Sequence, residues 1–448
     1  MDNKKTAILT KGPIKATLIN LSVPMIFGLL GMVAFNLVDT FFVSQLGTKQ
    51  LAALSFTFPV VLVIGSITLG LGFGTSSIIS KSIGEGDHKK AEQLTSASLL
   101  LSSFLAVFFV IFGYFTLTPV FSLLGAKNST IPLIGQYMYI WYAGLIFVVV
   151  PMIGNNILRA TGDTKTPSIL MLISFSVNMI LDPILIFGWG PFPRLELAGA
   201  AIATVFARGI TFIITLWVLI FREKLLKLSF PKIRDLIASW KQILYIGIPT
   251  VATRLVFPFA IGIITKIISF YGPEAVAAFG ISSKIELFAM IVIMALASVI
   301  GPFVGQNWGA GELKRLRKGI RYGEKVSLLW GSFVFVLLYF TADHIAHLFS
   351  KNPNIIAITT LYLKIASLGF GLQGVLIIVA TSLIVLNKPF HTSALVLFEM
   401  FILYVPLAFL GSKYFGINGI FYAIAISYSM AGIVSHLLIN SILKKKFI

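Results

Sequence analysis

The sequence predicts an all-α polytopic membrane protein with twelve transmembrane helices in two pseudo-symmetric six-helix bundles, a 6+6 parallel repeat. Three observations support this fold class. Of the 448 residues, 57% are hydrophobic and only 11% are charged, whereas soluble domains carry about 25% charged residues. Apolar runs long enough to cross a hydrocarbon core of about 30 Å recur along the whole chain. The second half of the chain also repeats the first at a constant offset.

Twelve apolar runs predict the individual helices. In the first half they lie near residues 15–45, 51–80, 93–124, 131–157, 165–190 and 196–221. In the second half they lie near residues 239–271, 276–306, 320–349, 354–385, 390–413 and 417–443. Several runs exceed the length that a straight span needs, which indicates tilted or kinked helices.

The formal net charge of +19 reflects membrane topology rather than nucleic-acid binding. Basic residues gather in every second connection and at the ends, in residues 81–90, 159–165, 222–241, 314–325 and 444–446. This alternation is typical of cytoplasmic loops under the positive-inside rule. We therefore expect both termini in the cytoplasm, a multi-pass location in the cytoplasmic (inner) membrane, and contacts with anionic lipid headgroups.

Several function classes are disfavoured by what the sequence lacks. There is no cysteine, which excludes disulfides and thiolate metal sites. No GxxxxGK[ST] motif for nucleotide binding occurs, and no cleavable signal peptide is apparent. The sequence thus favours a protein that is not an enzyme, needs no cofactor and is not driven directly by ATP.

The internal repeat has an offset of 225 residues, as seen where Pro24 matches Pro249, Gly47 matches Gly272 and Tyr137 matches Tyr362. An offset that spans an even number of helices gives two lobes of the same orientation. Such parallel repeats predict a substrate cavity between two lobes and alternating access by rocking. We assign residues 1–221 to an N-lobe, 222–241 to a basic cytoplasmic linker that includes Pro231, and 242–448 to a C-lobe.

Asp39 and Asp182 are the acidic residues within the apolar segments of the first half. A charged side chain inside a membrane is costly, and by default it marks a functional site. The repeat places Ile264 opposite Asp39. After a short slip that matches Pro167 with Pro389, it places Tyr404, or Val405 if the register slips further, opposite Asp182. We therefore expect the carboxylate chemistry to belong to the N-lobe alone.

Other polar residues are expected at the level of these acids. Asp39 and Asp182 lie roughly 9–12 Å below the outer ends of their helices at 1.5 Å per residue. The same depth in the neighbouring antiparallel helices reaches Tyr137 and Thr204, with Tyr139 and Tyr142 as alternatives to Tyr137. Helical spacing puts two asparagines on the faces of the acids: Asn36 with Asp39, and Asn178 with Asp182.

This group of oxygen-bearing side chains predicts a proton relay or a site for a small hard cation, with Asp39 and Asp182 as ligands if the cation is Na⁺. The alternative is that the two acids only satisfy packing neighbours between helices. Amides would serve that purpose at lower cost, so we favour the functional interpretation.

Seven motifs resemble those of the multidrug and toxic compound extrusion (MATE) transporters across essentially the whole chain. They are NLVDTFFVSQLG, SIGEGDHKKA, ILRATGDTKTP, NMILDPILIFG, LAGAAIAT, GPEAVAAFGISSKIE and VGQNWGAGELKR. The resemblance is closest to the branch named after the DNA-damage-inducible F protein (DinF). In that branch the functional residues match Asp39, Tyr137, Asn178, Asp182 and Thr204; Asn36 is added from its helical facing.

The resemblance implies a secondary active efflux antiporter that exports lipophilic or organic cations and drugs in exchange for H⁺ or Na⁺. It further implies a helix kink at Pro24, function as a monomer, membrane lipids as partners and no nucleic acid. The other large MATE branch has cation-binding acids in helices 7 and 10, where this sequence has Phe257 and no acid.

Two alternative functions are less consistent with the sequence. A lipid-linked oligosaccharide flippase would share the superfamily architecture, but it would favour a cationic cavity, and the intramembrane cations Arg208, Arg254 and Lys266 are few and scattered. A channel is disfavoured by the asymmetric acids. Arg254 is expected either to counter an anionic substrate group or to pair with Glu399 or Glu286.

Overall fold

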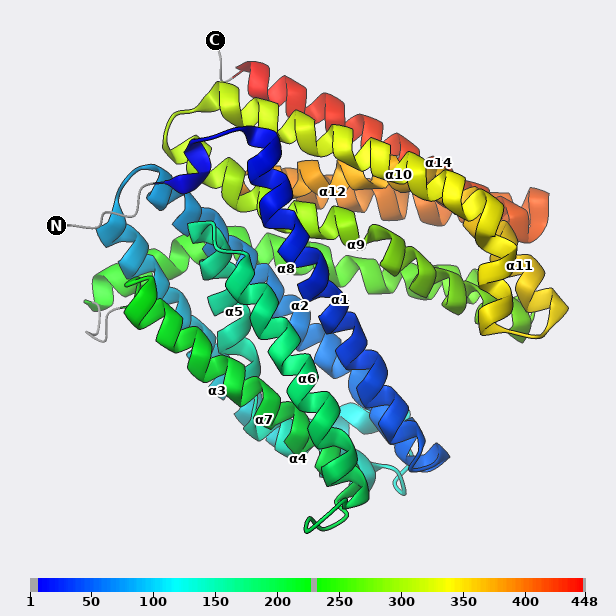
Figure 1. Ribbon diagram of the computed structural model, residues 1–448. Helices are drawn as coiled ribbons and strands as arrows, with labels where there is room; N and C mark the ends of the chain where they lie inside the picture. Colours follow the sequence, from blue (N-terminus) through cyan, green and yellow to red (C-terminus); the bar gives the residue numbers. More distant parts are fainter. Residues whose placement is uncertain (1–6, 227–231, 446–448) are drawn as a thin grey trace. The chain divides into compact units, whose positions relative to one another are not determined.

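The computed structural model describes residues 7–226 and 232–445, and within these ranges the regular structure is helical. The first half holds seven α-helices: α1 (Ile14–Ser44), α2 (Thr48–Gly84), α3 (His88–Leu123), α4 (Ile131–Ala143), α5 (Ile146–Thr161), α6 (Lys165–Phe187) and α7 (Glu196–Trp217). The second half holds α8 (Ile233–Ser269), α9 (Pro273–Gly309), α10 (Leu313–Phe349), α11 (Pro353–Ala366), α12 (Phe370–Val385), α13 (Pro389–Leu397) and α14 (Val405–Lys445) (Figure 1).

These helices make twelve spans in the described part of the chain. The pair α4 and α5 forms one span bent by 50°, and α11 and α12 are continuous through a short 3₁₀ turn. The last apolar stretch, Pro389–Lys444, has 56 residues, which is roughly 84 Å of helix and too long for one span. It breaks at Gly416 (φ 63°, ψ −148°) into two spans. The predicted fold class is confirmed. The span limits differ from the predicted ranges by at most seven residues, the largest difference being at the start of α10, Leu313 against the predicted 320.

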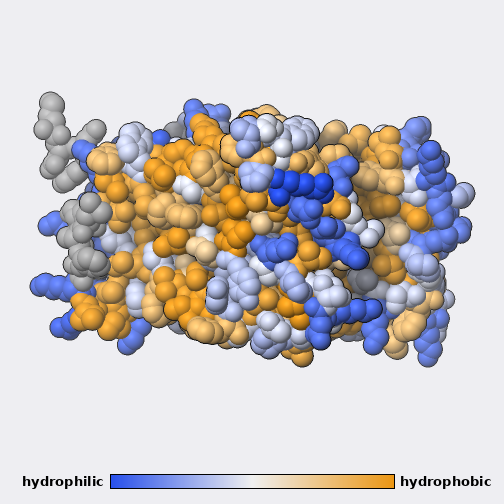
Figure 2. Space-filling model, turned by 90° about the horizontal axis from the view of Figure 1, so that it is seen from below, coloured by the Kyte–Doolittle hydropathy of each residue, from blue (hydrophilic) through white to orange (hydrophobic). Residues whose placement is uncertain are grey.

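Apolar side chains are abundant on the surface as well as in the core. Large exposed residues include Phe115 (80%), Phe270 (78%) and Phe340 (73%). Figure 2 shows hydrophobic residues over much of the visible surface. A soluble protein would have to hide such residues, whereas a lipid-facing surface accommodates them.

The internal repeat is visible in the backbone at the helix ends. Gly47 and Gly272, which match at the 225-residue offset, precede α2 and α9 with φ of 124° and 98°. Gly86 and Gly311 follow the same two helices with φ of 75° and 74°. Residues other than glycine rarely adopt positive φ angles, so both halves of the repeat need glycine at these turns.

The chain divides into two compact units, one of Met1–Ile8 and Val23–Ile248 and the other of Leu9–Ser22 and Pro249–Ile448. This division differs from the predicted lobe limits at residues 221 and 242. The first part of α8 belongs to the first unit, and the first part of α1 belongs to the second. Residues 227–231 of the predicted linker, including Pro231, lie outside the described residues. Two of the changes of unit, after Ser22 and after Ile248, fall next to Pro24 and Pro249, which are matching positions in the repeat.

Specific contacts explain both exchanged segments. Within the first unit, the Trp240 Nε1 of α8 donates to the Ala97 carbonyl of α3 over 2.9 Å. Within the second unit, the Arg315 Nη1 of α10 donates to the Gly12 carbonyl over 2.6 Å, and its Nη2 donates to the Lys11 carbonyl over 2.8 Å. The Asn307 amide also donates to the Leu9 carbonyl over 3.2 Å. Side chains of the VGQNWGAGELKR motif therefore hold the beginning of the chain on the second unit.

Candidate functional site

Four helices of the first unit bring five predicted residues into its interior. Asp39 comes from α1, Tyr137 from α4, Asn178 and Asp182 from α6, and Thr204 from α7. All five are buried, from 0% exposed for Asn178 and Asp182 to 9% for Asp39. They form the N-site of this structure, defined by these five residues.

Small residues allow the four helices to approach closely enough to form the N-site. Gly199 in α7 lies against the Leu185 backbone of α6, so a side chain at this position would collide with that backbone. Gly28 in α1 similarly packs against α6, where an added Cβ would lie 2.9 Å from the Ser168 Cα. Small residues are the usual means of close helix packing in membranes. The LAGAAIAT motif, which ends at Thr204, thus begins in close contact with α6.

The N-site is a connected polar group. The Asn178 Nδ2 donates to the Asp182 Oδ1 over 3.0 Å. The Tyr137 hydroxyl lies beside Thr204 and within electrostatic range of both Asp39 and Asp182, and the two carboxylates also interact electrostatically with each other. Two carboxylates this close repel each other when both are ionised, so a bound cation or proton relieves the repulsion.

Four buried oxygens of the N-site have no hydrogen-bond partner among the described residues. They are Asp39 Oδ1, Asp182 Oδ2, Asn178 Oδ1 and Thr204 Oγ1. Leaving a buried polar atom without a partner costs about 1–3 kcal/mol, and more when the group is charged. A site with four such oxygens fits a proton or a hard cation such as Na⁺, because either would satisfy lone pairs that the protein leaves free. The described residues hold no group of three or more His, Cys, Asp or Glu suited to a metal ion, so any cation ligands here must include the amide and the hydroxyls.

Arg208 is an additional member of this region that the sequence analysis noted but did not assign. It lies on α7 one turn after Thr204, and its guanidinium carbon is 4.9 Å from the centre of the Phe35 ring of α1. Its charge also interacts with Tyr137. The sequence could have predicted this position, because Arg208 follows Thr204 by four residues and so lies on the same face of the helix. The N-site therefore has a cation at its edge as well as two acids.

The structure does not bring Asn36 into the N-site. Asn36 is exposed, and its Nδ2 donates to the Met32 carbonyl of its own helix over 3.0 Å. The predicted face of Asp39 is instead shared with buried Phe35, four residues earlier. Of the two alternatives to Tyr137, Tyr139 is 40% exposed and its ring packs against that of Tyr114 with an angle of 49° between the ring planes. Tyr142 is buried, but its ring packs against Gly113 of α3.

Pro24, the predicted kink, lies inside the uninterrupted helix α1. Pro24 lies two residues after Ser22, where the segment that belongs to the second unit ends. Proline removes one helical hydrogen bond and weakens the helix locally. The position of Pro24 therefore coincides with the change from one unit to the other along α1.

The second unit also holds interior carboxylates, the buried Glu399 and the partly buried Glu286, which corrects the expectation that such acids belong to the N-lobe alone. Glu286 of α9 accepts a hydrogen bond from the Tyr362 hydroxyl over 2.5 Å and another from the Tyr428 hydroxyl over 2.7 Å. Glu399 is 1% exposed and lies beside Gln373. Both acids are visible in the sequence. The prediction overlooked Glu286 and Glu399 because it considered only the repeat positions that match Asp39 and Asp182.

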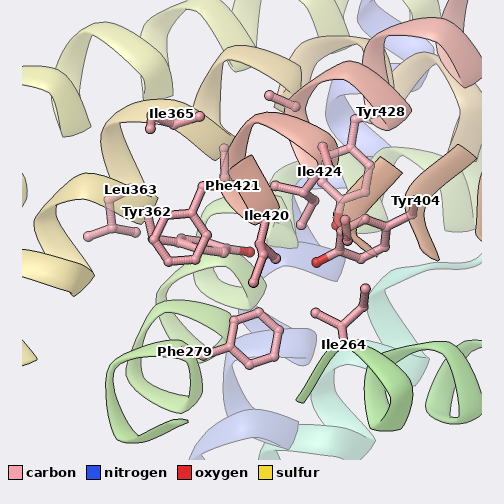
Figure 3. Close-up of a cluster of buried hydrophobic side chains, with 14 of the residues drawn as sticks. Ile264, Phe279, Tyr362, Leu363, Ile365, Tyr404, Ile420, Phe421, Ile424 and Tyr428 are labelled. Atoms are coloured by element: carbon pink, nitrogen blue, oxygen red, sulfur yellow. The ribbon is translucent and has the colours of Figure 1, made fainter. Parts of the chain in front are cut away.

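Aromatic side chains surround the Glu286 group. Figure 3 shows Tyr362, Tyr404 and Tyr428 in one cluster with Phe279, Phe421 and several isoleucines. Ile264 and Tyr404, which match Asp39 and Asp182 in the repeat, both belong to this buried cluster. The second unit therefore packs apolar and phenolic groups at the positions where the first unit has its acids.

Comparison with known proteins gives consistent matches over the whole length. The MatE family model matches residues 24–184 and 249–410. The chain is 38% identical to an FAD transporter of Shewanella oneidensis, over 97% of this chain and 96% of the relative. It is 27% identical to the "Probable multidrug resistance protein YpnP" of Bacillus subtilis, over 94% and 93% of the two chains. The crystal structure of the Vibrio cholerae MATE transporter VcmN in the bent form aligns with a TM-score of 0.92 and 28% identity, over 96% of this chain and 97% of the other.

Proposed function

Since this chain belongs to the MatE family of membrane transporters, we propose that it is a secondary active efflux antiporter whose N-site exchanges H⁺ or Na⁺ for cargo. A transporter of this family is not an enzyme, and the chemistry needed at the N-site is reversible binding of an ion. The observation that supports the proposal best is the set of four buried, unpaired oxygens around Asp39 and Asp182.

The proposed cycle follows from the cost of these unpaired oxygens. In the outward-facing state the two carboxylates take up H⁺ or Na⁺, which removes their mutual repulsion and allows α1 and α6 to approach. A change in α1 near Pro24 then shrinks the cargo space and expels the cargo. In the inward-facing state the ion leaves, and the repelling carboxylates reopen the site to new cargo. Rocking of two lobes in this way is the usual form of alternating access in repeat transporters.

Protons are the first candidate for the coupling ion, and Na⁺ at the same oxygens is the second. Uptake of one proton by two interacting carboxylates needs no further ligand. Na⁺ would need Asn178 Oδ1 and Thr204 Oγ1 in addition to Asp39 and Asp182, and all four have free lone pairs. The assignment to the DinF branch belongs to the same proposal, because in that branch the functional acids lie in the N-lobe.

Two cargo classes have specific support. The 38% identity to an FAD transporter favours an anionic aromatic dinucleotide, and Arg208 at the edge of the N-site offers the planar cation that phosphate and flat rings prefer. The similarity to multidrug resistance proteins favours lipophilic organic cations and drugs. We place the flavin dinucleotide first, because the identity to that relative is higher over the same span.

Efflux from right-side-out or reconstituted vesicles tests both parts of the proposal. Vesicles with wild-type protein, Asp39→Asn or Asp182→Asn are loaded with FAD or with ethidium, and export is followed under an inward pH gradient and then an inward Na⁺ gradient. Asp343→Asn is the matched control, since Asp343 is an exposed acid of α10. Loss in both N-site variants but not in the control is expected. Wild-type rates in both N-site variants would refute the N-site as the coupling site.

The location and assembly follow the predicted topology. We propose a multi-pass protein of the cytoplasmic membrane that functions as a monomer, with both termini in the cytoplasm. A C-terminal fluorescent tag should therefore be protected from a protease added outside intact cells. Cleavage of the tag from outside would reverse the orientation.

A further inference from the structure

A cavity of about 530 Å³ opens between α10 and α14 of the second unit. It is lined by Arg317 and Arg321 of α10 and by Leu437, Asn440, Ser441 and Lys444 of α14. Three of these six residues are cationic, two are neutral hydrogen-bonding groups, and one is apolar. The cavity is remote along the chain from every residue of the N-site, and the proposed transport cycle does not use it.

The two helices that line the cavity share a packing partner. Both α10 and α14 pack on α12, and Figure 1 shows α10 and α14 running alongside each other. A polar bridge joins the two helices beside the cavity: the His436 Nδ1 lies 3.0 Å from the Glu324 Oε1, and the Asn440 Nδ2 lies 2.8 Å from the His436 Nε2. The helices are therefore held at a distance that leaves room for a ligand group above the bridge.

The charge of the cavity is positive. Glu324 is the acid near the lining residues, and it is engaged by His436 while also interacting with Arg321. Arg317 and Arg321 are one helical turn apart on α10, so their guanidinium groups face the same side. Guanidinium groups form paired hydrogen bonds with phosphate oxygens. Asn440 and Ser441 can add neutral donors from the opposite wall.

An exposed apolar strip continues from the cavity along the helices. Leu437 in the cavity wall is 62% exposed, and Ile433, one turn earlier on α14, is 52% exposed. On α10, Leu328 lies two turns after Arg321 and is 43% exposed. A charged head position followed by apolar surface matches a molecule that carries a phosphate and hydrocarbon chains. A free phosphate ion would make no use of this strip.

The depth of the cavity fits the same ligand. Its cations come from the beginning of α10 and the end of α14, and these helix ends carry the basic clusters that the positive-inside rule assigns to the cytoplasmic face. Basic pockets between helices at that face are suited to anionic lipid headgroups.

From these observations we infer that the α10–α14 cavity is a binding site for the phosphate of an anionic phospholipid of the cytoplasmic leaflet, with its acyl chains on the strip of Leu328, Ile433 and Leu437. The site would hold one lipid molecule on the second unit. It is independent of the ion that drives transport and of the cargo.

Native mass spectrometry of the purified full-length protein with phosphatidylglycerol, cardiolipin or phosphatidylcholine tests the inference. The double variant Arg321→Ala with Lys444→Ala removes two cations from the cavity wall. The matched control, Lys318→Ala with Lys325→Ala, removes two exposed cations of α10 that do not line the cavity. Melting temperature in detergent, with and without each lipid, gives a second readout that does not depend on transport.

We expect one anionic lipid to remain bound to the wild type and to the control, with about a 30-fold weaker affinity in the cavity variant, since each basic residue near the headgroup contributes to binding. Equal losses in the two double variants would overturn the inference, because they would show general charge attraction. Stabilisation by inorganic phosphate alone that equals that by phosphatidylglycerol would also overturn it, as would equal binding of phosphatidylcholine. Lipid protection that the cavity variant loses and the control retains would support it.

Discussion

The two units of this protein share a helical plan and differ in how their buried acids are satisfied. In the first unit, Asp39 and Asp182 each have an oxygen with no partner among the described residues. In the second unit, Glu286 receives two phenol hydroxyls, from Tyr362 and Tyr428. An acid with unpaired oxygens can gain or lose an ion, whereas an acid with both oxygens paired is held in one arrangement. We therefore propose that the N-site exchanges an ion, whereas Glu286 has a structural role.

Two tyrosines at matching positions of the repeat interact with acids in different ways in the two units. Tyr137 and Tyr362 occupy the same place in the repeat. Tyr137 faces acids on α1 and α6, while Tyr362 donates to an acid on α9. The tyrosine is therefore at the same repeat position in both units, whereas the acid that interacts with it lies on a different helix in each unit. Glu399 differs from Glu286, because its Oε1 has no partner among the described residues.

The largest effect is expected from neutralising the acids of the N-site. Asp39→Asn or Asp182→Asn should reduce ion-driven export at least 100-fold, because an amide cannot take up a proton and binds Na⁺ weakly. Glu286→Gln should leave the dependence of export on the ion gradient unchanged. Export rates measured across a series of pH and Na⁺ gradients check both results. A loss of ion dependence in Glu286→Gln alone would assign the exchange role to the second unit.

The next effect concerns the packing that positions the carboxylates. Gly28 of α1 lies against Ser168 and Met171 of α6. Thr253, which matches Gly28 in the repeat, instead forms a 2.7 Å hydrogen bond with Ser393 in the second unit. Gly28→Val should force α1 away from α6 and destabilise the protein by about 1–3 kcal/mol, with reduced export.

Thr253→Val, which keeps the size of the side chain, serves as the control for Gly28→Val. It should lose the hydrogen bonds of the Thr253 hydroxyl with the Pro249 carbonyl and with the Ser393 hydroxyl, and cost about 1–2 kcal/mol. Thermal unfolding in detergent measures both changes. Equal melting temperatures for Gly28→Val and the wild type would show that the close approach of α1 to α6 is dispensable.

A smaller effect should separate the two tyrosines. Tyr362→Phe removes a donor from the partly buried Glu286 and should lower the free energy of unfolding by about 1–3 kcal/mol, with export per folded molecule unchanged. Tyr137→Phe should have the opposite pattern, since its hydroxyl belongs to the N-site: little loss of stability and a changed ion dependence of export. Melting temperature and vesicle efflux, measured on the same preparations, give the two readouts. The same pattern in both variants would remove the distinction between the units.

Much of this arrangement could be predicted from the sequence, because long apolar runs and a fixed repeat constrain helices strongly. The N-site acids stood out for the same reason, as charges among apolar neighbours. The exchange of Leu9–Ser22 and of the first part of α8 between units could not be predicted, because it depends on contacts such as that of Trp240 with the Ala97 carbonyl. The pairing of Glu286 with Tyr362 and Tyr428 was hidden for a similar reason: hydrogen bonds between distant helices leave no local pattern.

Asn36 should give the smallest effect, and it tests how far helical facing alone can assign a site. Its spacing of three residues from Asp39 predicted a shared face, yet the structure places the Asn36 side chain in an exposed position, bonded to the Met32 carbonyl. Asn36→Ala should therefore change export less than twofold and stability by less than about 0.5 kcal/mol. Asn178→Ala is the matched comparison, because Asn178 is fully buried and donates to Asp182. A loss of export in Asn36→Ala as large as in Asn178→Ala would return Asn36 to the ion pathway, since an exposed amide bonded only within its own helix has no other reason to affect transport.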